Sequence, residues 1–393
     1  MNIDSARLKF ICRLGYGDAL PKDEDAAGDI PVFGSNGQYS TTATRNTDAP
    51  AIVVGRKGSY GKINWAPDGC FASDTTFFID NNLTSSNLRW LYWALQTLRL
   101  DEGSQETAVP GLNRESVYEQ RLLWPGPENQ LLIAGYLDRE TERIDALVAE
   151  KEKMLALLDE KRASLISRAV TRGLDPNVPL KPSGLDWLGD IPTHWSIVRA
   201  KGLFHEVDRR TETGEEILLS LRMASGLVPH NDVSDKPLEP SDVIGFKKIA
   251  VGQMVINRMR AASGLIAVAS QDGLVSPDYA VFDILDPDLC IGYYLELFRT
   301  KVVQSLFRSA SKGLGTGEQG FLRLYTENFL ALHFPQPPKK ERYEIVQHIN
   351  EQKAEIEELS SALRTSIELA KERRAVLITA AVTGHIPIEE MRT

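Results

Sequence analysis

One short segment combines cations, an aromatic ring and glycines in a pattern that suits contact with a nucleic acid. Gly55, Gly58 and Gly61 alternate with five side chains that can bind or stack: Arg56, Lys57, Ser59, Tyr60 and Lys62. An arginine can donate two hydrogen bonds to a guanine edge, while lysines and backbone N–H groups hold phosphates. Glycines let the backbone approach a ligand closely. The segment therefore predicts a DNA contact, and the alternative is a solvated hairpin whose charge is incidental.

Three further segments have related chemistry. Residues 257–264 follow a similar apolar run and supply Arg258, Arg260 and Ser263. Ser35 and Asn36 lie in a glycine-rich stretch whose amide and hydroxyl groups can read bases or close a turn. Lys312 ends the polar stretch 308–312, and a comparable polar stretch covers 105–113. These last two stretches can contact DNA, but ordinary loop chemistry explains them equally well.

The sequence contains no pattern that predicts catalysis. The Asn-Pro-Pro-Tyr and Asp-Pro-Pro-Tyr tetrapeptides of amino-methyltransferases are missing, as are a Walker phosphate loop and a nuclease-like cluster of acids and lysines. The six histidines have no metal-ligand spacing. The glycines of 313–317 do not lie between a clear strand and a helix start, so a flexible loop is favoured there over a dinucleotide site. We expect no catalytic residue, metal or cofactor in this chain, and recognition as its role.

The composition limits which recognition proteins are possible. The chain has 393 residues, of which 42% are hydrophobic, so two or three globular domains are expected. It carries 54 acidic and 45 basic residues, a net charge of −9, and no part of it is basic overall. A uniformly basic nucleic-acid binder is therefore excluded. Any DNA-binding surface must be a local patch or be shared with a partner.

The cysteine content and the apolar runs indicate a cellular location. Three widely spaced cysteines fit free thiols in a reducing compartment. No apolar run is long enough to span a membrane, and the first residues do not resemble a secretory leader. We expect a cytoplasmic protein.

The chain repeats itself. Residues 161–171 recur as residues 373–383 with seven of eleven positions identical, and the offset of 212 holds back to Ile133 and Ile345. The segments ahead of these repeats also correspond, more weakly: 51–56 resembles 252–258. Each of those segments mixes short β-branched and aromatic runs with one helix, expected at 87–100 and at 291–307. The sequence thus predicts two copies of one plan, each a mixed α/β unit followed by a long helix.

An apolar column with a seven-residue period runs along each repeated helix, as in a coiled coil. A polar helix of about 40 residues needs a partner for its apolar face, and the obvious partner is the other copy. Independent core helices or a homodimeric coil are the alternatives. The residues assigned to helix pairing are Leu137, Ile144, Leu147, Leu158 and Leu165 in the first helix, and Ile349, Ile356, Leu359, Leu363 and Leu377 in the second.

The predicted order is globular unit, helix, globular unit, helix. The predicted boundaries are 1–126 for the first recognition unit, 127–173 for the first helix, 174–338 for a linker with the second unit, and 339–393 for the second helix and tail. Gly173 and Gly384 are expected to end the helices. If a pseudo-two-fold axis relates the copies, the helices run antiparallel and separate the two units.

Several motifs resemble one protein family. The run 183–195, with its Trp-Leu-Gly-Asp-Ile-Pro core, resembles the opening of target-recognition domains in specificity subunits of type I restriction-modification enzymes. The duplicated helix ends, the Arg56-Lys57-Gly58-Ser59 loop, and the proline-rich starts of both helices resemble the same family. The likeness extends over nearly the whole chain.

The resemblance implies a non-catalytic subunit with two target-recognition domains joined by an antiparallel coiled coil. In this family each domain reads one half of a bipartite double-stranded DNA target, and the helices set the unread spacer. Two methyltransferase subunits dock on the helices and domains for DNA methylation, and restriction and translocase subunits join that assembly. S-adenosylmethionine, ATP and Mg²⁺ belong to those partners.

Two other functions remain open on sequence alone. One is a protein scaffold with two α/β modules on a coiled coil and no nucleic acid, which the even charge distribution favours. The other is the specificity subunit of a related enzyme that cleaves on both sides of a bipartite site.

Overall fold

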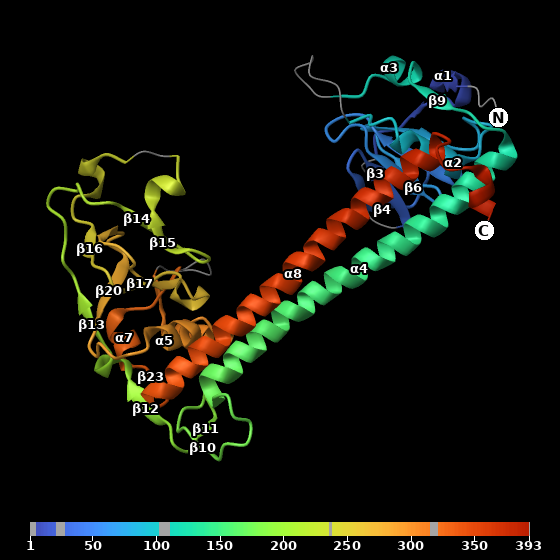
Figure 1. Ribbon diagram of the computed structural model, residues 1–393. Helices are drawn as coiled ribbons and strands as arrows, with labels where there is room; N and C mark the ends of the chain where they lie inside the picture. The colour runs from blue at the N-terminus through green and yellow to red at the C-terminus, as the bar shows by residue number, and fades with distance from the viewer. Residues whose placement is uncertain (1–4, 21–27, 102–110, 236–237, 315–320, 393) are drawn as a thin grey trace. The chain divides into compact units, whose positions relative to one another are not determined.

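The computed structural model describes residues 5–20, 28–101, 111–235, 238–314 and 321–392 (Figure 1). The chain divides into two compact units. Unit 1 comprises Met1–Lys153 and Leu363–Thr393, and unit 2 comprises Met154–Ala362. Two long helices, α4 (Pro127–Arg172) and α8 (Lys339–Val382), each contribute one part to each unit. The mixed α/β class and the two long helices predicted from the sequence are confirmed.

Unit 1 is built around a buried antiparallel sheet. The described strands form a four-stranded sheet in the order β2-β8-β5-β6 and a three-stranded sheet in the order β4-β3-β7. The strands are β1 (Ser5–Arg7), β2 (Gly15–Tyr16), β3 (Ile30–Gly34), β4 (Gly37–Thr42), β5 (Ala51–Gly55), β6 (Ile63–Ala66), β7 (Phe71–Ala72), β8 (Thr76–Ile79) and β9 (Arg121–Leu123). Every residue of β5 is buried, because its β-branched side chains pack on both faces of the sheet.

The helices of unit 1 cover one side of this sheet. They are α1 (Leu8–Ile11), α2 (Leu88–Gln96), α3 (Arg114–Tyr118) and the 3-10 helix η5 (Ile388–Arg392). Asn87 caps α2 by accepting a hydrogen bond from the Trp90 backbone N–H at 2.9 Å. Trp90, Leu91 and Ala94 project from α2 into a core that also contains Leu137 of α4 and Ala381 of α8. Both long helices therefore complete the core of unit 1.

Unit 2 repeats the same plan. Four of its described strands form an antiparallel sheet in the order β13-β20-β17-β18, and the other described strands form two-stranded sheets. The strands of the unit are β10 (Leu180–Pro182), β11 (Asp190–Pro192), β12 (Ser196–Arg199), β13 (Phe204–Val207), β14 (Leu219–Arg222), β15 (Gly226–Pro229), β16 (Lys247–Ile249), β17 (Met254–Asn257), β18 (Ile266–Val268), β19 (Gly273–Val275), β20 (Tyr279–Ile284), β21 (Lys312–Leu314), β22 (Phe321–Arg323) and β23 (His333–Gln336).

The helices of unit 2 are α5 (Ile291–Phe298), α6 (Lys301–Ala310), α7 (Thr326–Ala331) and the 3-10 helices η1 (Ala200–Gly202), η2 (His230–Asp232), η3 (Pro240–Val243) and η4 (Ala261–Ser263). The prediction of one helix over 291–307 was wrong, since Arg299 and Thr300 separate α5 from α6. Thr300 starts the second helix by accepting a hydrogen bond from the Val303 backbone N–H. The core below these helices is a cluster of phenylalanine rings, in which Phe298 and Phe334 have centroids 4.9 Å apart.

One backbone hydrogen bond fixes the correspondence between the units. In unit 1 the Leu112 N–H donates to the Arg56 carbonyl at 2.8 Å, and in unit 2 the Leu324 N–H donates to the Arg258 carbonyl at 2.9 Å. Arg56 follows β5 directly, as Arg258 follows β17. The weak sequence echo between 51–56 and 252–258 therefore marks equivalent positions in two copies of one sheet.

The segment that carries the family resemblance anchors the start of α8. The indole N–H of Trp195 donates to the Glu341 carboxylate at 3.0 Å, and His194 Nε2 lies 2.7 Å from the same oxygen. Trp195 itself is buried. Gly173 and Gly384 follow the C-terminal ends of α4 and α8. Their positive φ angles of 77° and 74° fit their predicted role of ending the helices.

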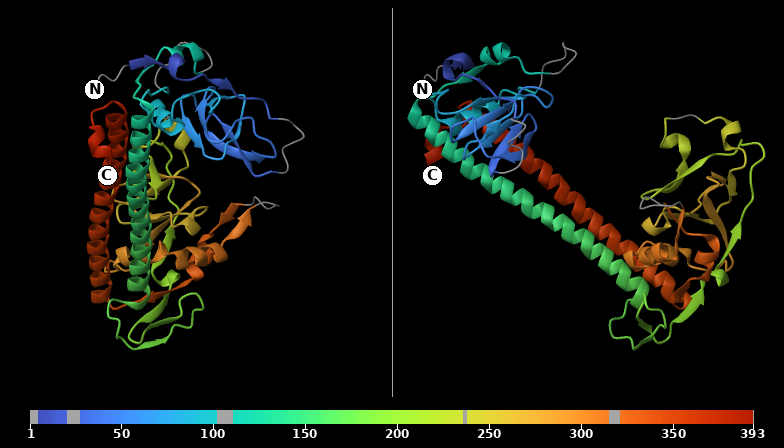
Figure 2. Two further views of the ribbon diagram at one scale, coloured as in Figure 1. Left: turned by 90° about the vertical axis from the view of Figure 1, so that its right-hand side faces the viewer. Right: turned by 180° about the vertical axis from the view of Figure 1, so that it is seen from behind.

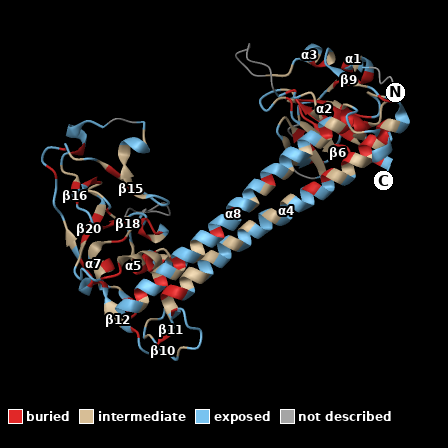
Figure 3. Ribbon diagram, in the orientation of Figure 1, coloured by how far each residue is buried: buried red, intermediate tan, exposed pale blue. Residues whose placement is uncertain are grey.

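Helices α4 and α8 pair antiparallel within each unit (Figure 2). In unit 1, Arg374 of α8 contacts Asp145 of α4 at 2.8 Å, and Leu137 packs in the same core as Val382. In unit 2, Leu165 of α4 lines one apolar recess with Ile356 of α8. Residue numbers rise along one helix as they fall along the other. Buried residues are few on both helices, and in α4 none lies between Ile144 and Ala169, where the surface is exposed or half-buried (Figure 3).

The first predicted column of the helix seam agrees with the burial pattern. Its buried members are Leu137, Ile144, Ile349 and Ile356, and its half-buried members are Leu158, Leu165, Leu363 and Leu377. The second column was wrong. Leu147 is 45% exposed and Leu359 is 55% exposed, so neither lies between the helices. The second column instead follows the first by four residues, with Thr141 and Val148 in α4 and Ser360 and Ile367 in α8.

This register predicts unequal effects of two neighbouring substitutions in α8. Ile356, which is 4% exposed, fills the seam, so Ile356→Ala should lower the free energy of unfolding by about 2 kcal/mol or more. Leu359→Ala should change it by less than about 0.5 kcal/mol. Urea denaturation followed by circular dichroism measures both. A larger loss for Leu359→Ala would contradict the register.

Candidate nucleic-acid interface

The glycine-rich loop of unit 1 is a tight turn at the end of β5. The Gly55 N–H donates to the Lys62 carbonyl at 2.9 Å, and the Gly61 N–H donates to the Gly55 carbonyl at 2.9 Å. Gly58 and Gly61 have positive φ angles of 74° and 81°. Lys57, Ser59 and Lys62 are exposed on this turn, while Arg56 and Tyr60 are half-buried. The loop therefore presents its cations and hydroxyl group on a constrained backbone.

The structure brings a second predicted segment against this loop. A Cβ atom on Gly55 would lie 2.7 Å from the Ser35 carbonyl oxygen, so the turn between β3 and β4 packs directly on the loop. Asn36 Oδ1 accepts a hydrogen bond from Lys62 Nζ, and the Ser35 N–H donates to Thr75 Oγ1 at 3.3 Å. Ser35, Asn36 and the loop thus form one surface, as their shared chemistry suggested but no sequence spacing indicated.

Arg56 is held by aromatic rings. Its guanidinium carbon lies 4.9 Å from the centroid of Tyr16 and 5.6 Å from that of Phe77. Arg114 lies over the same Tyr16 ring at 5.1 Å. No carboxylate of the described residues forms an ion pair with Arg56. Sequence reasoning missed Tyr16 and Arg114, because both are remote from the loop in sequence and reach it only through strand pairing and α3.

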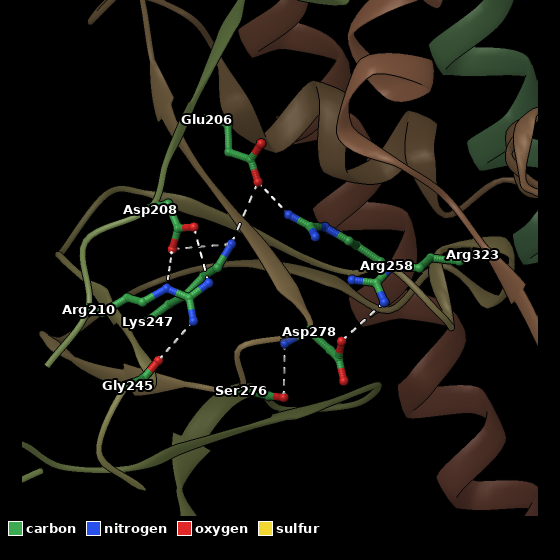
Figure 4. A network of polar contacts seen from close by, with 9 residues as sticks. All are labelled: Glu206, Asp208, Arg210, Gly245, Lys247, Arg258, Ser276, Asp278 and Arg323. Carbon is green, nitrogen blue, oxygen red and sulfur yellow. Dashed lines mark hydrogen bonds and ion pairs between the residues drawn. The ribbon is translucent and has the colours of Figure 1, made fainter. Parts of the chain in front are cut away.

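The equivalent arginine of unit 2 is held by a carboxylate. Arg258 Nη2 donates to Glu206 Oε1 on β13, and the Arg258 side chain is only 15% exposed (Figure 4). Lys247 Nζ lies 3.6 Å from the same Glu206 oxygen and 3.7 Å from Asp208 Oδ1. Asp208 in turn accepts hydrogen bonds from Arg210 at 3.1 and 3.2 Å. Three cations and two carboxylates therefore form one network.

Burial and charge perturb this network. The Lys247 side chain is 2% exposed, and its burial together with the charge of Arg258 lowers the pKa of Lys247. The hydrogen bond from Arg210 lowers the pKa of Asp208, with further contributions from Lys247. Asp208 is thus kept ionised by the cations around it, Arg210 above all.

The other predicted residues of unit 2 lie on exposed turns and strands. Arg260 and Ser263 are exposed, and the Arg260 N–H is oriented by Asn257 Oδ1 at 3.2 Å. Lys312 is exposed on β21, which pairs with β22. Of the neighbouring polar stretches, residues 105–110 and 315–317 lie outside the described residues.

Further cations lie close to this surface, and Arg323, Arg222 and Lys301 among them were not singled out from the sequence. Arg323 on β22 forms an ion pair with Asp278 at 3.2 Å. Burial raises the pKa of the Tyr279 hydroxyl, and the positive charges of Arg222 and Arg260 partly offset this effect. Helix α6, which contacts η4, exposes Lys301, Ser305 and Arg308 and contains no acidic residue. The helical spacing of Lys301 and Arg308 was the one available signal, because residues seven apart share a face.

The side chains of the two candidate surfaces are suited to binding a nucleic acid. The two surfaces offer guanidinium, ammonium, amide and hydroxyl donors at strand ends and on short loops. Within the described ranges no three His, Cys, Asp or Glu side chains are placed to hold a metal ion. No helix in the described part of the chain has the length and apolar character needed to cross a membrane.

Comparisons with known proteins agree with this architecture. No protein-family model matches the chain. The chain is 19% identical over 396 residues to the EcoDI type I restriction enzyme specificity subunit of Escherichia coli, covering 94% of this chain and 85% of that one. It is 26% identical over 110 residues to the EcoprrI specificity subunit of Escherichia coli, a match that spans 28% of this chain and 27% of the relative.

Two solved structures share the fold. A chain from a study of complex assembly in the type I restriction-modification system aligns with a TM-score of 0.69 and 14% identity, over 98% of both chains. The HsdS subunit from Thermoanaerobacter tengcongensis aligns with a TM-score of 0.52 and 15% identity, over 98% of this chain and 97% of that one. The chain is thus similar in sequence, over nearly its whole length, to a type I restriction enzyme specificity subunit, and it shares the fold of these two solved chains.

Proposed function

We propose that each unit reads one half of a bipartite DNA target, unit 1 through the Arg56 loop with Ser35 and Asn36, and unit 2 through the Arg258 segment. The observation that carries the proposal is the equivalence of Arg56 and Arg258. Arg56 follows β5 and Arg258 follows β17, which occupy equivalent places in the four-stranded sheets of the two units. The backbone carbonyl of each arginine accepts an equivalent backbone hydrogen bond. Two copies of one binding surface in one chain suit a target with two separate halves.

The chemistry of each surface supports a division of labour. Guanidinium groups donate two parallel hydrogen bonds to a guanine edge, so Arg56 and Arg258 are assigned to bases. The exposed lysines Lys57, Lys62 and Lys312 are point charges that suit phosphates. Arg260, Ser59, Ser263 and Tyr60 lie beside them and complete the two surfaces.

The long helices are assigned two roles. Their paired length sets the number of unread base pairs between the half-sites, and their exposed faces dock two methyltransferase subunits. Restriction and translocase subunits join that assembly. The chain is a non-catalytic subunit, and S-adenosylmethionine, ATP and Mg²⁺ act in the partners.

The net charge of −9 fits a chain that binds DNA as part of this assembly. Phosphate contacts supply most of the salt-dependent affinity of DNA-binding proteins. If the methyltransferase subunits provide most of these contacts, the specificity subunit needs only local cationic patches.

The proposal predicts that DNA binding depends on the partner. The isolated chain should bind duplex DNA weakly, and the chain assembled with its methyltransferase should bind tightly and with steep salt dependence. Selection from a random duplex pool, measured with and without the methyltransferase, tests this. The selected sequences should share two short motifs at a fixed separation. Tight sequence-specific binding by the chain alone, or a single undivided motif, would contradict the proposal.

Substitution of either arginine should affect one half-site only. Arg56→Ala should weaken discrimination in the half read by unit 1, and Arg258→Ala in the half read by unit 2, each by about 1–3 kcal/mol. Methylome sequencing of a host that carries each variant measures the change. Each variant serves as the other's control. Equal loss on all sequences would reassign the arginine to phosphate.

Lengthening both helices should change the spacer and leave the half-sites unaltered. Seven residues added to α4 and to α8 keep the seam in register and extend each helix by about 10 Å. The preferred spacer should grow by up to about 3 base pairs, given about 3.4 Å of duplex per base pair. Seven residues added to one helix alone provide the control. An unchanged spacer in the doubly extended variant would show that the helices do not measure it.

A further inference from the structure

The two equivalent arginines are supported by unlike side chains. Gly15 pairs with Phe78 in unit 1, and Val207 pairs with Val281 in unit 2. Because Phe78 and Val281 face Val53 and Val255 at matching positions of β5 and β17, Gly15 and Val207 are equivalent. The residues on either side of them are therefore equivalent as well.

These flanking residues differ completely in charge. Unit 1 has Leu14 and Tyr16 around Gly15, whereas unit 2 has Glu206 and Asp208 around Val207. Tyr16 holds Arg56 through its ring, a contact that leaves the guanidinium charge uncompensated. Glu206 holds Arg258 through a charge-assisted hydrogen bond. The same backbone thus carries one arginine on an aromatic face and the other on a carboxylate.

The carboxylate has two physical consequences for Arg258. A hydrogen bond to Nη2 restricts the rotation of the guanidinium plane, so that its remaining N–H groups keep a fixed direction. The negative charge of Glu206 also offsets the positive charge that would attract any phosphate. An arginine held in this way loses affinity for the DNA backbone in general and keeps its directional hydrogen bonds.

We propose that Glu206 is the positioning residue for Arg258 and makes this arginine a selective reader of one base pair in the half-site of unit 2. The inference rests on the proposed function. It assigns to unit 2 a recognition element that unit 1 lacks, since Leu14 occupies the equivalent position there.

A neighbouring residue provides a matched control. Asp208 lies two residues along the same strand and carries the same charge. It accepts hydrogen bonds from Arg210 and contacts Lys247, and no hydrogen bond joins it to Arg258. Asp208→Asn therefore removes one negative charge from the network without releasing the Arg258 guanidinium.

The test uses the chain assembled with its methyltransferase subunits and a random-sequence duplex pool. In Glu206→Gln the side chain keeps its shape and loses its charge. Discrimination at one base pair of the unit 2 half-site should fall about tenfold, while binding to unrelated duplex rises and becomes more salt-sensitive. The half-site of unit 1 should be unaffected, and Asp208→Asn should leave the base preference of both halves unaltered.

A double-mutant cycle separates positioning from a general structural effect. If Glu206 acts through Arg258, Glu206→Gln should cause no further loss of discrimination in an Arg258→Ala background. Should Glu206→Gln fold poorly, Glu206→Asp keeps the charge and shortens the side chain, and a smaller loss at the same base pair is expected. An unchanged unit 2 motif in the folded variants, or equal losses in both halves, would overturn the positioning role. A wild-type complex that selects no bipartite sequence would instead overturn the proposed function, and this inference with it.

Discussion

The antiparallel pairing of α4 and α8 is the constraint on which the rest of the structure depends. Each helix exceeds forty residues and buries only a narrow apolar strip, so neither is stable without a partner along that strip. The ends of both helices also pack into the globular cores. Leu137 and Ala381 fill the core of unit 1, and Val170 and Ile345 fill the core of unit 2. The helices are therefore part of both globular cores, and a change in their register would disturb both.

The architecture could be predicted because it is repeated. The duplication of 161–171 as 373–383 indicated two copies of one plan, and a seven-residue period on polar sequence indicated a helical seam. The first column of that seam agrees with the burial pattern, since four of its members are buried and four are half-buried. The second column was wrong, since positions three and four residues after the first column both fit a heptad, and two members of the column that is observed, Thr141 and Ser360, are polar. Leu147 and Val148 are adjacent and both apolar, so only the packing could choose between them.

The candidate interface was only partly predictable for a related reason. The loops that follow β5 and β17 have a recognisable composition, and Arg56 and Arg258 were identified from it. The residues that hold these arginines, Tyr16 and Glu206, come from distant strands with no local motif. Antiparallel pairing with β8 and β20 brings them to the site, and the sequence contains no signal for that register.

The tail of the chain has a consequence for biosynthesis. Met391 in η5 is buried in the core of unit 1, together with Ile378 and Val382 of α8. All of unit 2 is translated between the first and last segments of that core. Unit 1 therefore remains unfinished on the ribosome until residues 363–391 have emerged. Until then the nascent polypeptide exposes the apolar surface of this core that Ile378, Val382 and Met391 complete in the folded chain.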